Sequence, residues 1–340
     1  MKQSLAVKYR PKTFEEVCGQ SLTATILKRM VEQQNFKSCY LFAGDSGCGK
    51  TTLARCLATA INQGLGTPEE IDAASHNGVD DVRAIVEAGK QRAIGCEYKI
   101  FIIDECHAIT TQGWQAYLKG LEETPPYTIY IFCTTEANKI PEAVLNRMQR
   151  FNITKINADE IKNRLMSICL AEGFSNFEKT CDLISKTSHG CMRDAIMKLE
   201  QCADYSTDLI LANAQKVINV SSYDAMLYLT WSLFHKDTAS VLYTTDKLFN
   251  SGVDLKNFIE LFIEFILDLA KVKLFNTIAV TNIPSYLEPQ VNEIICSVPD
   301  TSWFSTLVDI LLQVKLEIRY DSHYKSTIEA FLLRFCMPSA

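Results

Sequence analysis

The sequence predicts an α/β protein in which a parallel β-sheet is covered by helices on both faces and is followed by a purely helical region. Between residues 38 and 155, short apolar runs alternate with stretches of helical periodicity, which is typical of repeated βα units. A glycine-rich octet stands between the first apolar run and the first helical stretch. After about residue 156 only helical patterns follow.

Five strands are expected in the first region, because its apolar runs are rich in β-branched and aromatic residues, as buried parallel strands are. They are Cys39–Ala43, Glu70–Ala74, Tyr98–Ile103, Thr128–Cys133 and Arg150–Thr154. The predicted helices between them are Lys50–Ala60, Val79–Arg92 and Gln112–Glu123.

The remainder of the chain is predicted to be helical in two parts. The first part has helices at Ala158–Gly173, Phe177–Thr187, Cys191–Ala203 and Leu209–Ile218. The second has helices near residues 223–235, 238–251, 254–276, 287–297, 301–314 and 322–337. We therefore predict three domains: an α/β core at 1–155, a small helical domain at 156–219 and a larger helical domain at 220–340.

Composition indicates a soluble globular protein, with 47% hydrophobic and 22% charged residues. The net charge of −6 argues against a surface that is basic throughout, although residues 1–60 alone carry nine Lys/Arg against four Asp/Glu. Phe258–Phe275 is the most hydrophobic stretch, but Glu260, Glu264, Asp268 and Lys271 recur in it at helical spacing and predict one polar stripe. We expect no membrane segment and no signal peptide at Met1–Arg10.

The thirteen cysteines are scattered singly, without a CxxC pair. That pattern does not support a zinc site built on closely spaced thiolates. We expect most of them to be small buried side chains in a cytoplasmic, reducing environment.

The octet Gly44–Thr51 matches GxxxxGK[ST], between a predicted strand and a predicted helix. Its glycines would let backbone N–H groups and the helix N-terminus surround a phosphate. Lys50 suits the β- and γ-phosphates of ATP, and the Thr51 hydroxyl suits Mg²⁺. The candidate nucleotide-binding residues here are Gly44, Ser46, Gly47, Cys48, Gly49, Lys50, Thr51 and Thr52.

Asp104 and Glu105 end a predicted strand, where open α/β sheets place ligand-binding residues. Asp104 is suited to Mg²⁺ and Glu105 to orienting, or taking a proton from, an attacking water. Thr135 follows the strand that we expect beside the one carrying Asp104, so it could bond a γ-phosphate or that water, or simply end the strand. Arg147 and Arg193 lie on predicted helical segments, where either could form a surface ion pair.

The order of these motifs resembles the clamp-loader branch of the AAA+ ATPases, in particular the bacterial DNA polymerase III gamma/tau subunits. The resemblance covers most of the first 205 residues. Besides the octet it includes Lys8–Phe14, Val17, Gly19–Gln20, Ile71–Ser75, Asp104–His107, Leu118–Glu123, Thr134–Glu136, Ile140–Pro141 and Met192–Ala195. Beyond residue 220 it is one of helical character only.

The resemblance implies that Tyr9, Arg10, Pro11 and Val17 wall an adenine pocket. It implies that Thr135 is sensor 1 and that Arg193 is a sensor-2 arginine reaching the γ-phosphate. Arg147 resembles the arginine finger that completes a neighbouring subunit's site. The helical parts would be a lid and an oligomerising collar of a ring-like, pentameric assembly.

Three departures from the family pattern stand out. The finger motif Ser-Arg-Cys is here Asn146-Arg147-Met148. The interval Ile61–Glu69, where the family has a zinc module, is short and has no cysteine, so no zinc is expected. The candidate DNA-contacting residues Ser75, His76 and Asn77 lack the basic side chains that the family places there, which predicts weaker phosphate contacts.

The resemblance implies an ATP- and Mg²⁺-dependent subunit that works with other loader subunits or its own copies, a sliding clamp and primer–template DNA. Two alternatives are another AAA+ DNA-dependent ATPase, of the branch-migration or fork-maintenance type, and a non-hydrolysing structural subunit of a loader. ATP-driven strand displacement would favour the first. Turnover unchanged by Glu105→Gln would favour the second.

Overall fold

The computed structural model describes residues 3–218 and 221–337. The chain divides into two compact units, Met1–Ile168 with Ser188–Glu200, and Cys169–Thr187 with Gln201–Ala340. We call them the α/β unit and the helical unit. The division into three domains at 1–155, 156–219 and 220–340 stays a prediction, and its second boundary falls on residues 219–220, outside the described residues.

The α/β unit is built on a five-stranded parallel sheet with the order β2-β3-β4-β1-β5. Its strands are β1 (Cys39–Gly44), β2 (Glu69–Asp72), β3 (Lys99–Asp104), β4 (Thr128–Thr134) and β5 (Gln149–Ile153). The strands end in register, since Asp104 pairs with Asp72 and Ala43 pairs with Thr134. The predicted fold class is confirmed, as is the expectation that the strand ending in Asp104 lies beside Thr128–Cys133.

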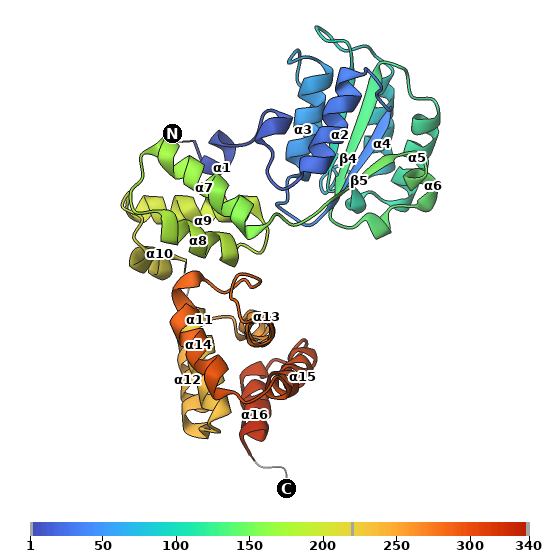
Figure 1. The fold of residues 1–340 in the computed structure, drawn as a ribbon. Helices are drawn as coiled ribbons and strands as arrows, with labels where there is room; N and C mark the ends of the chain where they lie inside the picture. Colours follow the sequence, from blue (N-terminus) through green and yellow to red (C-terminus); the bar gives the residue numbers. More distant parts are fainter. Residues whose placement is uncertain (1–2, 219–220, 338–340) are drawn as a thin grey trace. The chain divides into compact units, whose positions relative to one another are not determined.

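Helices cover both faces of the sheet because its strands carry apolar side chains on both sides (Figure 1). Tyr40 and Phe42 of β1 pack with Leu53 of α3 on one face, whereas Leu41 packs with Trp114 of α5 on the other. The first face is covered by α2 (Ser21–Glu32) and α3 (Lys50–Ile61). The second is covered by α4 (Val79–Gly89), α5 (Thr111–Glu122) and α6 (Glu142–Leu145).

Several short or N-terminal elements were not among the sequence predictions. They include α1 (Leu5–Lys8), the 3-10 turn η1 (Phe14–Glu16), α2, and the 3-10 turns η2 (Cys106–Ala108) and η3 (Ala137–Lys139). The apolar spacing of Ala24, Leu27 and Val31 marks the buried side of α2 and could have revealed it. Before α2, the Gln20 amide donates to Thr154 O at 2.7 Å and so ties the N-terminal segment to the end of β5.

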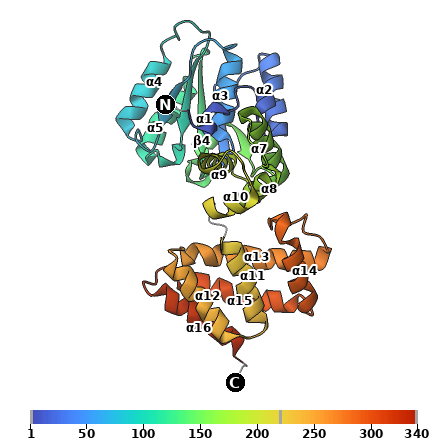
Figure 2. The ribbon, with the colours of Figure 1, turned by 90° about the vertical axis from the view of Figure 1, so that its left-hand side faces the viewer.

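The helices after the sheet match the predicted ones to within a few residues. They are α7 (Ala158–Glu172), α8 (Glu178–Thr187), α9 (Met192–Tyr205), α10 (Leu211–Val217), α11 (Ser221–Phe234), α12 (Thr238–Asn250), α13 (Leu255–Phe275), α14 (Glu288–Ser297), α15 (Ser302–Glu317) and α16 (Tyr324–Cys336), with a 3-10 turn η4 (Ser285–Leu287) before α14. Figure 2 shows α11–α16 packed together as one group of helices. Their buried apolar side chains form one core. Phe262 and Leu269 of α13 are fully buried in it.

One detail of α13 differs from the expected polar stripe. Glu260 and Lys271 are about half-exposed, but Asp268 is buried, with only 4% of its surface exposed. Its carboxylate accepts hydrogen bonds from Lys271 Nζ at 2.7 Å and from the Asn282 backbone N–H at 2.9 Å. These hydrogen bonds offset the cost of burying the Asp268 carboxylate. The bond to Asn282 also fixes the chain that follows the helix.

Candidate nucleotide-binding site

We call the glycine-rich loop at residues 44–51 the lysine loop. It runs from the end of β1 into the first turn of α3. Gly47 and Gly49 have φ angles of 71° and 103°, in the left-handed region that glycine adopts without strain. No atom lies within 4 Å of the place where a Cβ on Gly49 would stand. The backbone here is open to close approach, which fits a loop that surrounds a phosphate group.

Lys50 closes over its own loop. Its ammonium group donates to Gly44 O and to Asp45 O, both at 2.9 Å, and the residue is only 6% exposed. Beside it, burial raises the pKa of the Cys48 thiol, so this loop cysteine remains protonated at neutral pH. The loop thus offers one buried positive charge and a row of backbone groups to an anion.

Thr51 and Asp104 meet at the carboxyl edge of the sheet. The Thr51 hydroxyl donates to Asp104 Oδ2 at 2.8 Å, although 53 residues separate the two. A hydroxyl and a carboxylate in contact are hard oxygen donors of the kind that Mg²⁺ prefers. The structure therefore brings the lysine loop and the strand-end aspartate to one place, which a shared metal–nucleotide complex requires.

Glu105 follows Asp104 with a φ of 47°, a left-handed conformation that costs a non-glycine residue free energy. Its Oε2 accepts a long hydrogen bond of 3.4 Å from Thr135 Oγ1. The same oxygen lies 3.3 Å from His107 Nδ1. The candidate residues Glu105 and Thr135 are thus in contact, together with a histidine to which the sequence analysis gave no role.

The N-terminal residues assigned to an adenine pocket lie along α3 and α7. Pro11 O accepts a weak bond from the thiol of Cys56 on α3 at 3.7 Å, and Tyr9 O accepts from Arg164 of α7 at 2.9 Å. Val17 packs against the core on the α3 side of the sheet, and Arg10 is half-buried. Pro11 and Val17 therefore lie on the α3 side of the sheet, and Tyr9 is held by α7.

Arg193 lies in the first turn of α9, beside the loop. A Cβ built on Gly47 would come within 2.1 Å of Cys191 Sγ and 3.5 Å of Arg193 Cβ. The beginning of α9 thus packs directly on the lysine loop, and only glycine fits at position 47. Arg193 therefore begins close to the loop, and its role as a sensor stays a prediction.

Arg147 was expected on a helix, and that expectation is wrong. It lies in the turn after α6, which ends at Leu145, because the chain must reverse there to enter β5. Its guanidinium donates to Glu122 Oε1 at 2.5 Å and to Ala143 O at 2.6 Å. Gln149 at the start of β5 pairs with Tyr40, four residues before Gly44, so the start of β5 is ~13 Å along the strands from Gly44, and Arg147 precedes that point in the chain.

The three candidate DNA-contacting residues form an exposed loop between β2 and α4. The Ser75 hydroxyl donates to Asp72 O at 3.1 Å and is 3.1 Å from His76 Nδ1. Asn77 O accepts from the backbone N–H and the hydroxyl of Thr110, both at 3.2 Å. The loop is therefore anchored at its end, while Ser75 and His76 are exposed and Asn77 is partly buried.

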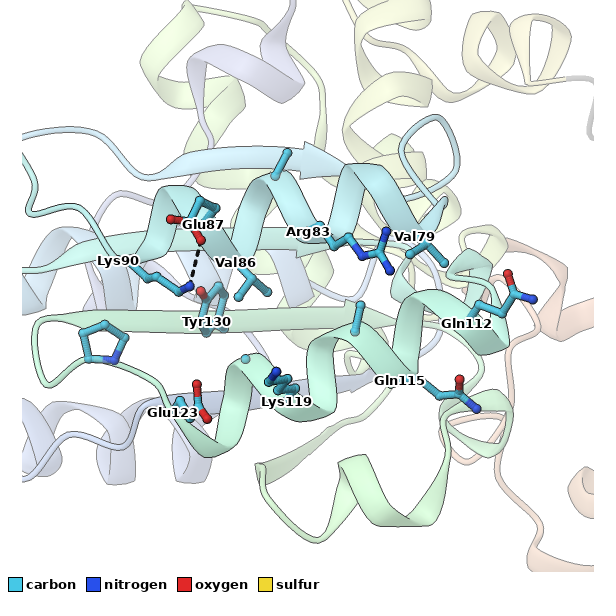
Figure 3. A pocket seen from close by; sticks show the side chains of 14 residues that line it. Val79, Arg83, Val86, Glu87, Lys90, Gln112, Gln115, Lys119, Glu123 and Tyr130 are labelled. Carbon is cyan, nitrogen blue, oxygen red and sulfur yellow. Dashed lines mark hydrogen bonds and ion pairs between the residues drawn. The ribbon is translucent and has the colours of Figure 1, made fainter.

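A groove of about 970 Å³ runs along α4 and α5, and Figure 3 shows the side chains that line it. It carries both signs of charge, and Glu87 forms an ion pair with Lys90 at 2.7 Å on its wall. It shares no residue with the lysine loop. Its lining residues are Val79, Arg83, Ala84, Val86, Glu87, Lys90, Gln112, Gln115, Ala116, Lys119, Gly120, Glu123, Pro125 and Tyr130.

Within residues 3–218 and 221–337, no group of three or more His, Cys, Asp or Glu side chains is placed to hold a metal ion. Over the same described ranges, every helix is too short or too polar to cross a lipid bilayer.

The fold and the loop together define an AAA-type P-loop domain. Residues 40–156 match the model of the family described as ATPase family associated with various cellular activities (AAA). A solved structure of RuvB from Thermotoga maritima, a Holliday junction branch migration motor, superimposes with a TM-score of 0.53 over 62% of this chain and 72% of that one. At 19% identity, this likeness concerns the fold alone.

Within that class, the chain is similar to the gamma and tau subunits of DNA polymerase III, as predicted. It is 30% identical to the tau subunit of Bacillus subtilis, over 99% of this chain and 64% of that protein. It is 27% identical to the gamma subunit of Buchnera aphidicola subsp. Schizaphis graminum, over 98% of this chain and 97% of that one. The chain thus spans less than two thirds of the tau subunit and nearly all of the gamma subunit.

Proposed function

We propose that this chain is the ATPase subunit of a cytoplasmic sliding-clamp loader in DNA replication. ATP binding would hold a ring-like, pentameric assembly in the form that opens a clamp and places it on primer–template DNA, and hydrolysis would release the clamp. The observation that carries the proposal is the contact of Thr51 with Asp104 at 2.8 Å, beside Lys50. Similarity to gamma and tau subunits along nearly the whole chain supports it.

Each residue at the site has a separate role in ATP hydrolysis. Lys50 and the loop backbone would bind the phosphates, and Thr51 with Asp104 would hold Mg²⁺, which would neutralise phosphate charge. Glu105 orients the attacking water and accepts its proton. Thr135 contacts Glu105, and Arg193 approaches the loop from α9. Tyr9, Arg10, Pro11 and Val17 receive the adenine.

Arg147 acts on a neighbouring subunit. It precedes β5 and therefore lies toward the amino edge of the sheet, whereas the lysine loop and Asp104 lie at the carboxyl edge. That separation within one chain is what a residue working in trans requires. A charge supplied by a neighbour stabilises the transition state only when subunits are packed together, so hydrolysis is coupled to assembly.

The test is ATP turnover by the assembled complex, purified after co-expression with its neighbouring replication subunits. Turnover should rise when primed DNA and the cognate clamp are added together. Unprimed double-stranded DNA without the clamp is the matched control. A turnover that stays constant on addition of both, or strand displacement driven by ATP, would overturn the assignment.

A further inference from the structure

His107 connects two carboxylates at the edge of the nucleotide-binding site. Its Nδ1 lies 3.3 Å from Glu105 Oε2 and 3.2 Å from Thr134 Oγ1. Its Nε2 lies 3.5 Å from Glu136 Oε1. The side chain is only 20% exposed, so the ring is packed between these partners rather than extended into solvent.

Glu136 and Thr134, two of the partners of His107, are themselves held in place by further contacts. Glu136 pairs with Lys139 at 2.9 Å, and its backbone N–H donates to Thr134 Oγ1 at 3.0 Å. Thr134 is fully buried at the end of β4. The Lys139 hydrogen bond lowers the pKa of Glu136, which therefore stays ionised and can only accept hydrogen bonds. His107 is thus anchored to the segment that follows β4.

At the other side of the His107 ring is Glu105, the carboxylate whose direction must be fixed. Glu105 has a left-handed backbone, and its hydrogen bond from Thr135 is long at 3.4 Å. Its carboxylate is 39% exposed, so packing alone does not fix its direction. A ring nitrogen at 3.3 Å supplies a second contact from a side chain that is better anchored.

We propose that His107 is a positioning residue: it holds the Glu105 carboxylate in its working direction and links that direction to the end of β4 through Thr134 and Glu136. This inference rests on the proposed ATPase function. It adds a residue that touches neither the lysine loop nor Asp104 through any described hydrogen bond. A movement of the segment 134–139 would be passed to Glu105 through the ring.

The test compares three substitutions at position 107 by steady-state ATP turnover and nucleotide titration. An Asn amide nitrogen can stand near the position of Nδ1, whereas a Gln amide nitrogen reaches toward that of Nε2. His107→Ala should lower kcat by about 10-fold or more while KM and nucleotide affinity stay unchanged. His107→Asn should recover kcat more than His107→Gln does.

A double-mutant cycle shows whether His107 acts through Glu105. In the Glu105→Gln background, His107→Ala should lower kcat no further. His323→Ala, an exposed histidine of the helical unit, is the matched control and should leave kcat unchanged. Thermal unfolding of each variant separates a loss of folding from a loss of positioning.

Several outcomes would overturn the inference. They are full kcat in His107→Ala, better recovery by Gln than by Asn, a loss of nucleotide affinity equal to the loss of kcat, or an additive loss in the Glu105→Gln background. If the unaltered assembly hydrolysed no ATP, the proposed function would fall as well. The two failures are therefore distinguished by the turnover of the unaltered protein.

Discussion

The two units differ in the hydrogen bonds that many of their buried and part-buried polar side chains form, although Thr180 and Asp268 of the helical unit also bond across 29 and 14 residues. In the helical unit, the hydroxyls of Thr230, Thr244 and Thr245 donate to carbonyls four residues earlier in their own helices, at 2.7, 2.8 and 3.0 Å. In the α/β unit, Thr51 and Gln20 reach across 53 and 134 residues of sequence. Local bonds of the first kind only satisfy a buried group, whereas long-range bonds of the second kind also fix the geometry of a site.

The comparison therefore predicts that polar substitutions have their largest functional effects in the α/β unit, and that the helical unit responds mainly through stability. Substitutions in each unit, with matched controls, test this difference.

The largest effect is expected for Lys50→Ala. It removes the buried positive charge that the loop holds ready for phosphate, so ATP affinity should fall by more than about 100-fold. Equilibrium titration with a fluorescent ATP analogue measures this directly. Lys90→Ala removes a half-exposed lysine of the same unit and should bind as the unaltered protein does. Equal affinities for all three proteins would refute the role of Lys50.

Arg147→Ala should lower turnover of the assembled complex by about 10³-fold and leave ATP binding intact, because the arginine completes a neighbour's site. Arg150→Ala, a nearby exposed arginine bonded to Asn152, is the control. A mixed assembly of Arg147→Ala and Lys50→Ala subunits would show which interface each residue serves. Unchanged turnover in Arg147→Ala would remove this residue from the mechanism.

Phe262→Ala tests the helical unit. Removing a fully buried ring leaves a cavity and should cost about 3–5 kcal/mol in the free energy of unfolding of that unit. The ATP affinity of the folded protein should not change. Phe249→Ala, at a side chain with 41% exposure, should cost less than Phe262→Ala. A loss of ATP affinity in folded Phe262→Ala would show that the contrast between the units is too simple.

The smallest effect is expected for Glu122→Gln. Its ion pair with Arg147 is exposed on both sides, at 54% and 39%, and exposed pairs contribute about 0–1 kcal/mol. The melting temperature should therefore stay within error of the unaltered protein. A large loss of stability would mean that the pair has a structural role beyond orienting Arg147.

Much of the architecture could be predicted because the signals are local. Strands β1, β3 and β4 are nearly continuous apolar runs, and the octet marks its own loop by glycine spacing. All five strands were predicted to within about two residues, although β2 and β5 are more polar. The contact between Thr51 and Asp104 followed from the rule that parallel strands present their carboxyl ends at one edge.

What the sequence did not reveal depends on tertiary contacts. The roles of His107 and Glu136 arise only because β3 and β4 are neighbours, which brings residues 105, 107, 134 and 136 together. Asp268 looked like part of a polar stripe, but the turn at Asn282 supplies the partner that lets it be buried. Arg147 lies outside a helix, contrary to the prediction, because α6 is only four residues long and ends at Leu145.

The central claim is that the lysine loop and Asp104 share one metal–nucleotide complex. It is tested most directly by titrating ATP against the unaltered protein and Asp104→Asn, each with Mg²⁺ and with a chelator. We predict that Mg²⁺ tightens ATP binding to the unaltered protein and has much less effect on Asp104→Asn, while binding of metal-free ATP is similar in both. An equal effect of Mg²⁺ on the two proteins would contradict the claim.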